Sequence, residues 1–158
     1  METQRKNEII QKALGYDISH VVKRFAKDNN ISFDDVIEYE IELKRFLILC
    51  VLYPNKQFAM SSEIVDELWH TFIWHTQSYF DFCKSTGGKY IHHEPTPGDH
   101  ENLECDEITL LYLETFDTLP SLRVWSMLNQ DIKEFTCSRS PASCHHKLSS
   151  EKYATLQM

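Results

Sequence analysis

The residue types best suited to metal or acid–base chemistry gather in one thirty-residue stretch, DELWHTFIWHTQSYFDFCKSTGGKYIHHEP, which covers residues 66–95. It holds four histidines, one cysteine and four acidic residues. Imidazole, thiolate and carboxylate groups are the side chains that bind transition metals and transfer protons near neutral pH. The stretch is therefore either a metal or catalytic site or the polar part of a helical core.

Asp66 and His70 stand four residues apart, which places them one turn apart on the same face of a helix. At that spacing the two groups can bind one ion, or the carboxylate can hold the imidazole in one tautomer. Two ligands are too few for zinc, which takes about four, with about three from protein in catalytic sites. We expect the missing ligands from His92 and His93, because a turn at Gly87-Gly88 can fold that segment back toward the helix.

Two interpretations of Asp66 and His70 stay open. In the first, the set of two imidazoles and a carboxylate binds a divalent metal such as zinc, iron or nickel. In the second, Asp66 orients His70 as a buried hydrogen-bonded pair beside Trp69, with no metal. The sequence contains no HExxH motif and no paired CxxC motifs, which would indicate zinc directly.

His75, Tyr79 and Cys83 fall on the opposite face of the same predicted helix, together with Leu68 and Phe72. Free cysteine usually behaves as a small buried hydrophobe, so we predict that these three residues belong to the core. Cys83 and His75 are weaker candidates for metal binding. A Cys83 thiolate activated by a histidine would alternatively act as a nucleophile.

A second group of soft metal ligands lies near the C-terminus: Cys137, Cys144, His145 and His146. Their spacing matches no standard zinc finger. From about residue 133 the sequence is poor in apolar residues, which predicts a loosely ordered, flexible polar tail over 133–158 behind a helical domain over 1–132.

The elements that must position these residues are all predicted to be helices. Apolar residues recur at helical spacing over 7–15, 17–30, 32–54, 62–84 and 101–116, with a short further element at 119–130. Ser32 followed by Asp35 is typical of a capping box, and Ser61 or Ser62 can cap the fourth helix. The second half of 33–53 is apolar nearly all round, which predicts a central helix. The predicted fold is all-α, a compact single domain of about five or six helices.

Length and composition limit the possible functions. The 158 residues suit one domain, and the formal net charge of -8 disfavours binding to nucleic acid. The longest apolar run, FLILCVLY, is far shorter than a membrane span. Five cysteines without an export signal favour reduced thiols, so we expect a cytoplasmic protein with no membrane contact.

The pattern from VDELWH through YFDFCKSTGGKYIHHEP resembles the glycine-rich domain-containing protein-like family of bacteria, whose plant relatives carry a glycine-rich tail. The resemblance covers roughly residues 35–126, and the matching positions are Asp66, Trp69, His70, Tyr79, Cys83, Gly88, His92, His93 and Pro95. Two departures stand out. Phe72 replaces a second histidine found in many relatives, and with only 4 glycines the chain corresponds to a short form without the tail. The resemblance implies no reaction.

The leading hypothesis is a small helical protein whose His/Asp site binds a divalent metal in a binding or accessory role. The first alternative is a metal-assisted hydrolase with Asp66 and His70 at its centre and Glu94 as the base. The second is an interaction module in which the histidines are structural and an acidic helical surface meets a protein partner. No complete catalytic set can be assembled from the sequence.

Overall fold

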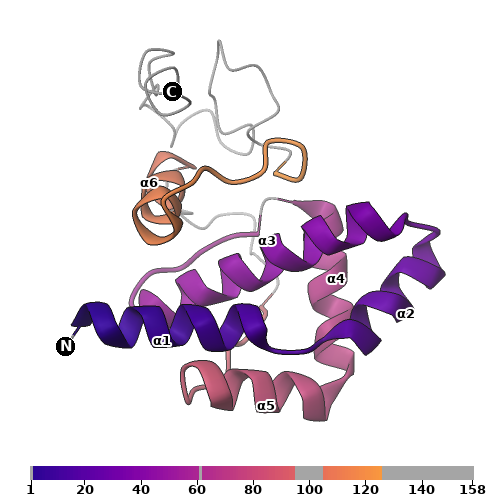
Figure 1. Cartoon of the computed structure of the whole chain (residues 1–158), viewed down its shortest axis with the longest axis horizontal. Helices are drawn as coiled ribbons and strands as arrows, with labels where there is room; N and C mark the ends of the chain where they lie inside the picture. The colour runs from indigo at the N-terminus through magenta and orange to yellow at the C-terminus, as the bar shows by residue number, and fades with distance from the viewer. Residues whose placement is uncertain (1, 61, 95–104, 126–158) are drawn as a thin grey trace.

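The computed structural model describes residues 2–60, 62–94 and 105–125, and in these ranges the chain forms six α-helices and no strand (Figure 1). The helices are α1 (Glu2–Gly15), α2 (Ser19–Asn29), α3 (Phe33–Leu52), α4 (Glu63–Trp74), α5 (Thr76–Thr86) and α6 (Cys105–Phe116). The predicted all-α fold is confirmed. None of the helices in these ranges combines the length and apolar character that a membrane span requires.

The central element is α3, which packs against α1, α2, α4 and α6. In Figure 1, α1 lies between α3 and α5, and α6 lies on the other side of α3. Leu43, Phe46, Leu47 and Leu49 are fully buried. A helix with neighbours on several sides has little solvent-facing surface in its middle, which explains why the second half of α3 is apolar nearly all round.

Side-chain caps mark the N-termini of α3 and α4. The backbone N–H of Asp35 donates to the Ser32 hydroxyl oxygen at 3.2 Å, and that hydroxyl donates back to the Asp35 carboxylate at 2.8 Å. At the start of α4 the backbone N–H of Val65 donates to the hydroxyl oxygen of Ser62 at 3.4 Å. Both caps satisfy N–H groups that the first helical turn leaves unpaired, as the sequence predicted.

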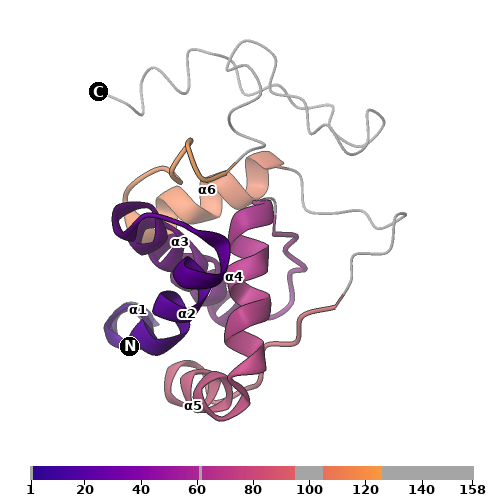
Figure 2. The ribbon, with the colours of Figure 1, turned by 90° about the vertical axis from the view of Figure 1, so that its right-hand side faces the viewer.

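The predicted continuous helix over 62–84 is wrong, because it is interrupted at His75. This residue adopts φ -81° and ψ 64°, outside the helical region, and separates α4 from α5. Its backbone N–H donates to the carbonyl of Phe72 at 3.0 Å, and its Nδ1 lies 2.9 Å from the carbonyl of Thr71. Figure 2 shows α5 turned away from the axis of α4. Apolar periodicity does not reveal a break of one residue that involves neither glycine nor proline.

Of the short element predicted over 119–130, the structure describes only residues 119–125, in which no helix is formed. Up to Trp125 the segment forms a turn, in which the N–H groups of Val124 and Trp125 both donate to the carbonyl of Ser121, at 3.1 and 2.9 Å. Residues 126–130, the tail over 133–158 and its Cys137, Cys144, His145 and His146 lie outside the described residues.

A buried carboxylate fastens α6 to α3. Glu42 is only 2% exposed, and its two oxygens accept hydrogen bonds from the Tyr112 hydroxyl at 3.0 and 2.9 Å and from Trp125 Nε1 at 2.7 Å. Arg45 pairs with Glu42 at 3.4 Å and donates to the Tyr112 hydroxyl at 2.9 Å. Burying a charge is costly unless it is paired and hydrogen-bonded, and the four contacts of the Glu42 carboxylate meet that condition.

The Glu42 network predicts a large effect of Glu42→Gln. The amide has one acceptor oxygen where the carboxylate had two, and its N–H₂ group faces donors, so Tyr112 or Trp125 loses its partner. We expect a loss of about 3 kcal/mol in the free energy of unfolding, measured by urea denaturation. Glu114→Gln, at an exposed position on α6, should change it by less than about 0.5 kcal/mol. Equal effects of the two changes would contradict the assigned role of Glu42.

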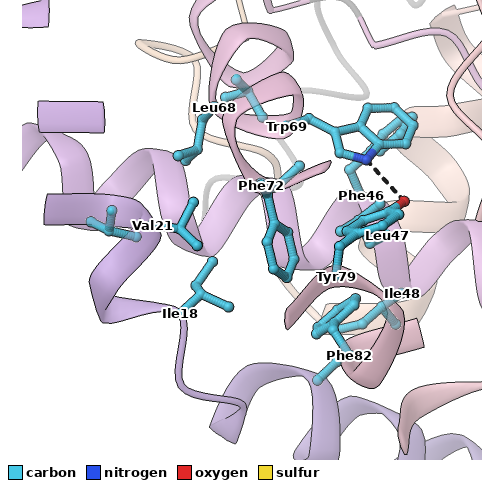
Figure 3. Packing of buried hydrophobic residues seen from close by; sticks show 14 of the residues in the cluster. Ile18, Val21, Phe46, Leu47, Ile48, Leu68, Trp69, Phe72, Tyr79 and Phe82 are labelled. Carbon is cyan, nitrogen blue, oxygen red and sulfur yellow. Dashed lines mark hydrogen bonds between the residues drawn. The ribbon is translucent and has the colours of Figure 1, made fainter. Parts of the chain in front are cut away.

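The core also contains Trp69, which is 4% exposed and packs edge-on against Phe46 with ring centroids 5.4 Å apart (Figure 3). Trp69→Ala should lower the free energy of unfolding by about 3–5 kcal/mol, because it leaves a cavity in the core. Trp74→Ala is the matched control, since Trp74 is 80% exposed and should contribute less than about 0.5 kcal/mol. Chemical denaturation of both variants tests this, and a loss below about 1 kcal/mol for Trp69→Ala would refute the core assignment.

Candidate metal centre

Three side chains that the sequence singled out meet at one point. Asp66 and His70 lie one turn apart on α4, and His93 follows α5. Nε2 of His93 lies 2.8 Å from Nε2 of His70 and 3.0 Å from Oδ1 of Asp66. Nε2 of His70 lies 3.5 Å from Oδ2 of Asp66. One ligand atom from each residue falls within 4.8 Å of the other two, so the expected proximity of His70 to a histidine after the glycine turn is found.

The turn that brings the chain back to α4 requires glycine at both positions after α5. Gly88 has φ +73°, a conformation that other residues rarely adopt. A Cβ atom at Gly87 would lie 2.6 Å from Cγ1 of Val51, so α5 could not end so close to α3. The N–H groups of both glycines donate to the carbonyl of Cys83 at 3.1 Å, which closes the helix. The predicted reversal thus has a steric and a conformational cause.

Trp69 and Tyr79 hold the returning segment in place. The Tyr79 hydroxyl donates to the carbonyl of Ile91 at 2.6 Å and accepts from Trp69 Nε1 at 3.1 Å, the bond drawn in Figure 3. The Trp69 indole also stacks on the His93 ring, with centroids 4.0 Å apart and planes 8° from parallel. Burial raises the pKa of Tyr79, so its hydroxyl stays protonated and remains a donor. Two contacts therefore hold His93 in place. Its ring stacks on Trp69, and the backbone of Ile91, two residues earlier, accepts the hydrogen bond from Tyr79.

The electrostatics of His93 suit a metal ligand. Burial lowers the pKa of its imidazole, against the opposing pull of the Asp66 carboxylate. The neutral ring offers a lone pair, which is the form that binds metals. Two imidazole nitrogens at 2.8 Å must share either a proton or a cation, because two lone pairs facing each other repel.

The spacing of the cluster is close to what a first-row metal requires. A tetrahedral zinc with bonds of about 2.0–2.1 Å holds its ligand atoms about 3.3 Å apart. The two imidazole nitrogens are 2.8 Å apart, Oδ1 of Asp66 lies 3.0 Å from Nε2 of His93, and Oδ2 of Asp66 lies 3.5 Å from Nε2 of His70. With one oxygen from Asp66, the three ligand atoms lie within 4.8 Å of one another, and binding a metal would require them to move to its spacing.

The other predicted candidates lie outside this cluster. His92 is exposed, with its ring edge-on to Tyr90 at 4.9 Å, and Glu94 is exposed as well. His75 is half-buried at the junction of α4 and α5, so its assignment to the core is wrong. Cys83 is buried, as predicted, and burial raises its thiol pKa, which disfavours a nucleophilic thiolate.

The supporting role of two aromatic residues was not predicted from the sequence. Tyr79 was predicted in the core and Trp69 beside a buried pair, and both are buried. The hydrogen bond between them and the stack of Trp69 on His93 have no counterpart in the sequence pattern. Ten residues and a helix break separate Trp69 from Tyr79, so periodicity could not align them.

A family model described as UCP032817-like matches residues 5–106 of this chain. The matched span contains most of α1, all of α2 to α5 and all three residues of the cluster, and it stops just after the start of α6. No curated protein and no solved structure matches the chain.

The hydroxyl of Tyr79 yields a test of how His93 is held. Tyr79→Phe keeps the ring but removes the bonds to Ile91 and Trp69, at a cost of about 1–2 kcal/mol in stability. We expect the His93 ring to leave its stacked position, so the ring-current shifts that the Trp69 indole induces on the His93 ring protons should shrink in ¹H–¹³C NMR spectra.

Tyr112→Phe is the control, because it removes another buried hydroxyl that lies in the Glu42 network. It should leave the ring protons of His93 unshifted. Unchanged His93 signals in Tyr79→Phe would refute the supporting role of the hydroxyl.

Proposed function

The chain belongs to the UCP032817-like family, and we propose that it binds one divalent transition metal through Asp66, His70 and His93, in a binding or accessory role. The observation that carries this proposal is the convergence of three ligand atoms within 4.8 Å from α4 and the segment after α5. A carboxylate and two imidazoles favour zinc, iron or nickel over magnesium or calcium, which prefer oxygen ligands.

The supports around the cluster favour a site over an incidental contact. Metal-binding histidines are typically held in one orientation by surrounding groups. The stack of Trp69 on His93 and the bond from Tyr79 to the backbone of Ile91 serve that purpose here.

A binding role fits better than the hydrolase alternative. A hydrolase needs a base beside the metal-bound water, and Glu94 was the residue expected to supply it. Glu94 is exposed, and among the described residues Asp66 is the only carboxylate in the cluster. The interaction-module alternative, with structural histidines, predicts no metal at all.

The pattern around Asp66, His70 and His93 supports the proposed relationship to the glycine-rich domain-containing proteins. Cys50 and Cys83 are free thiols, which supports the proposal of a reducing, cytoplasmic location. The proposed accessory role includes a protein partner.

Metal content tests the proposal. Purified protein is incubated separately with zinc, with nickel and, without oxygen, with iron(II), then desalted and analysed by mass spectrometry for metals. We expect about one metal per chain in the wild type. His70→Ala and His93→Ala each remove one of three ligands and should weaken binding by at least about 100-fold.

His92→Ala is the matched control, because it removes the adjacent exposed histidine and leaves the cluster intact. It should bind metal like the wild type, and circular dichroism should show all variants folded. A wild type that takes up none of the three metals would refute the proposal. Equal losses in His92→Ala and His93→Ala would refute the ligand set.

A further inference from the structure

We infer that the metal held by Asp66, His70 and His93 keeps open coordination positions toward solvent, where it binds a small monoanionic oxygen-donor ligand of the carboxylate class, with an aromatic body resting on Trp74. This inference rests on the proposed metal site. It adds to that proposal the class of ligand that binds to the metal and the residue, Trp74, that selects the ligand.

The number of ligands leaves room on the metal. Within the described ranges, the group of possible ligands comprises these three residues and no fourth. The next carboxylate, Glu67, has Oε1 3.9 Å from Nδ1 of His70, the ring nitrogen opposite the one in the cluster. Sites with three protein ligands use the remaining positions for water or an exchangeable ligand.

Among the residues that the structure describes, the Trp69 indole covers one side of the cluster, and the open positions would face away from it. The His93 side chain is 17% exposed and lies under the indole of Trp69. The Asp66 side chain is 29% exposed and that of His70 is 43% exposed. A ligand would therefore approach past His70 and Asp66.

The formal charge of the metal with its three ligands favours a small monoanion as the bound ligand. A divalent metal with one carboxylate and two neutral imidazoles keeps a formal charge of about +1, which one negative charge neutralises. The chain as a whole carries a formal charge of -8, and this repels phosphates and other multiply charged anions. A monocarboxylate satisfies both conditions.

Trp74 provides a surface for the rest of the ligand. It lies four residues after His70 on α4, a spacing that puts two side chains next to each other on a helix. Helical side chains generally lean toward the helix N-terminus, so we expect the indole on the side of the turn that carries His70. The side chain is largely exposed and can receive an aromatic ring.

Two hydroxamates, which bind metals as monoanionic oxygen donors and serve here as analogues of a carboxylate, test the inference. Cobalt(II) is loaded into the full chain, and its visible absorption is followed during titration with acetohydroxamate and with benzohydroxamate. Both should shift the cobalt bands in a saturable way. Benzohydroxamate should bind about three- to tenfold more tightly, because its ring stacks on an indole.

Two variants separate the parts of the inference. Trp74→Ala should bind cobalt normally and lose the preference for benzohydroxamate. Phe80→Ala, which removes a half-exposed aromatic ring on α5, should keep it. A preference that survives in Trp74→Ala would overturn the role of Trp74.

The failure of this inference can be told apart from the failure of the metal site. Cobalt that binds but does not respond to either hydroxamate would show a closed site and overturn the inference while the metal site stands. Absence of cobalt bands in the wild type, together with no uptake of zinc, nickel or iron, would overturn both.

Discussion

The candidate site depends on one side chain, the indole of Trp69, which belongs to the core and to the site at once. Its edge packs against Phe46 of α3, its nitrogen donates to the Tyr79 hydroxyl, and its face covers the His93 ring. A buried indole needs a partner for its N–H group, and Tyr79 meets that need while bonding onward to the backbone of Ile91. The packing of the core thereby sets the position of a histidine that is 24 residues further along the chain.

The break at His75 matters for the same reason. Had α4 continued to Lys84, Tyr79 and the glycine turn would extend along the α4 axis, away from Asp66 and His70. The change of direction lets α5 pack against α1 and brings the end of α5 close to α3, where Gly87 meets Val51. The segment after Gly88 then runs back along α4, and His93 arrives beside His70.

The sequence patterns predicted the structure correctly where it follows local rules of helix burial, capping and spacing. The apolar character of α3 predicted its central place, and the capping box at Ser32 marked its start. The spacing of Asp66 and His70 and the pair of glycines predicted the cluster. What local rules could not supply was the choice between His92 and His93. Adjacent residues in an extended segment point to opposite sides, and only the stack on Trp69 decides which one faces α4.

Two of the buried polar systems among the described residues have different tasks. The first joins α4, α5 and residues 91–93 around Trp69 and Tyr79, and it lies within the span of the family model. The second is the Glu42 network, in which two of the partners, Tyr112 and Trp125, lie beyond that span. Both contact the aromatic ring of Phe46, which packs against Trp69 at 5.4 Å and Trp125 at 6.4 Å. The family span thus holds all three residues of the candidate site, and the α6 segment covers α3 and supplies Tyr112, which bonds to the buried Glu42 carboxylate beside Arg45.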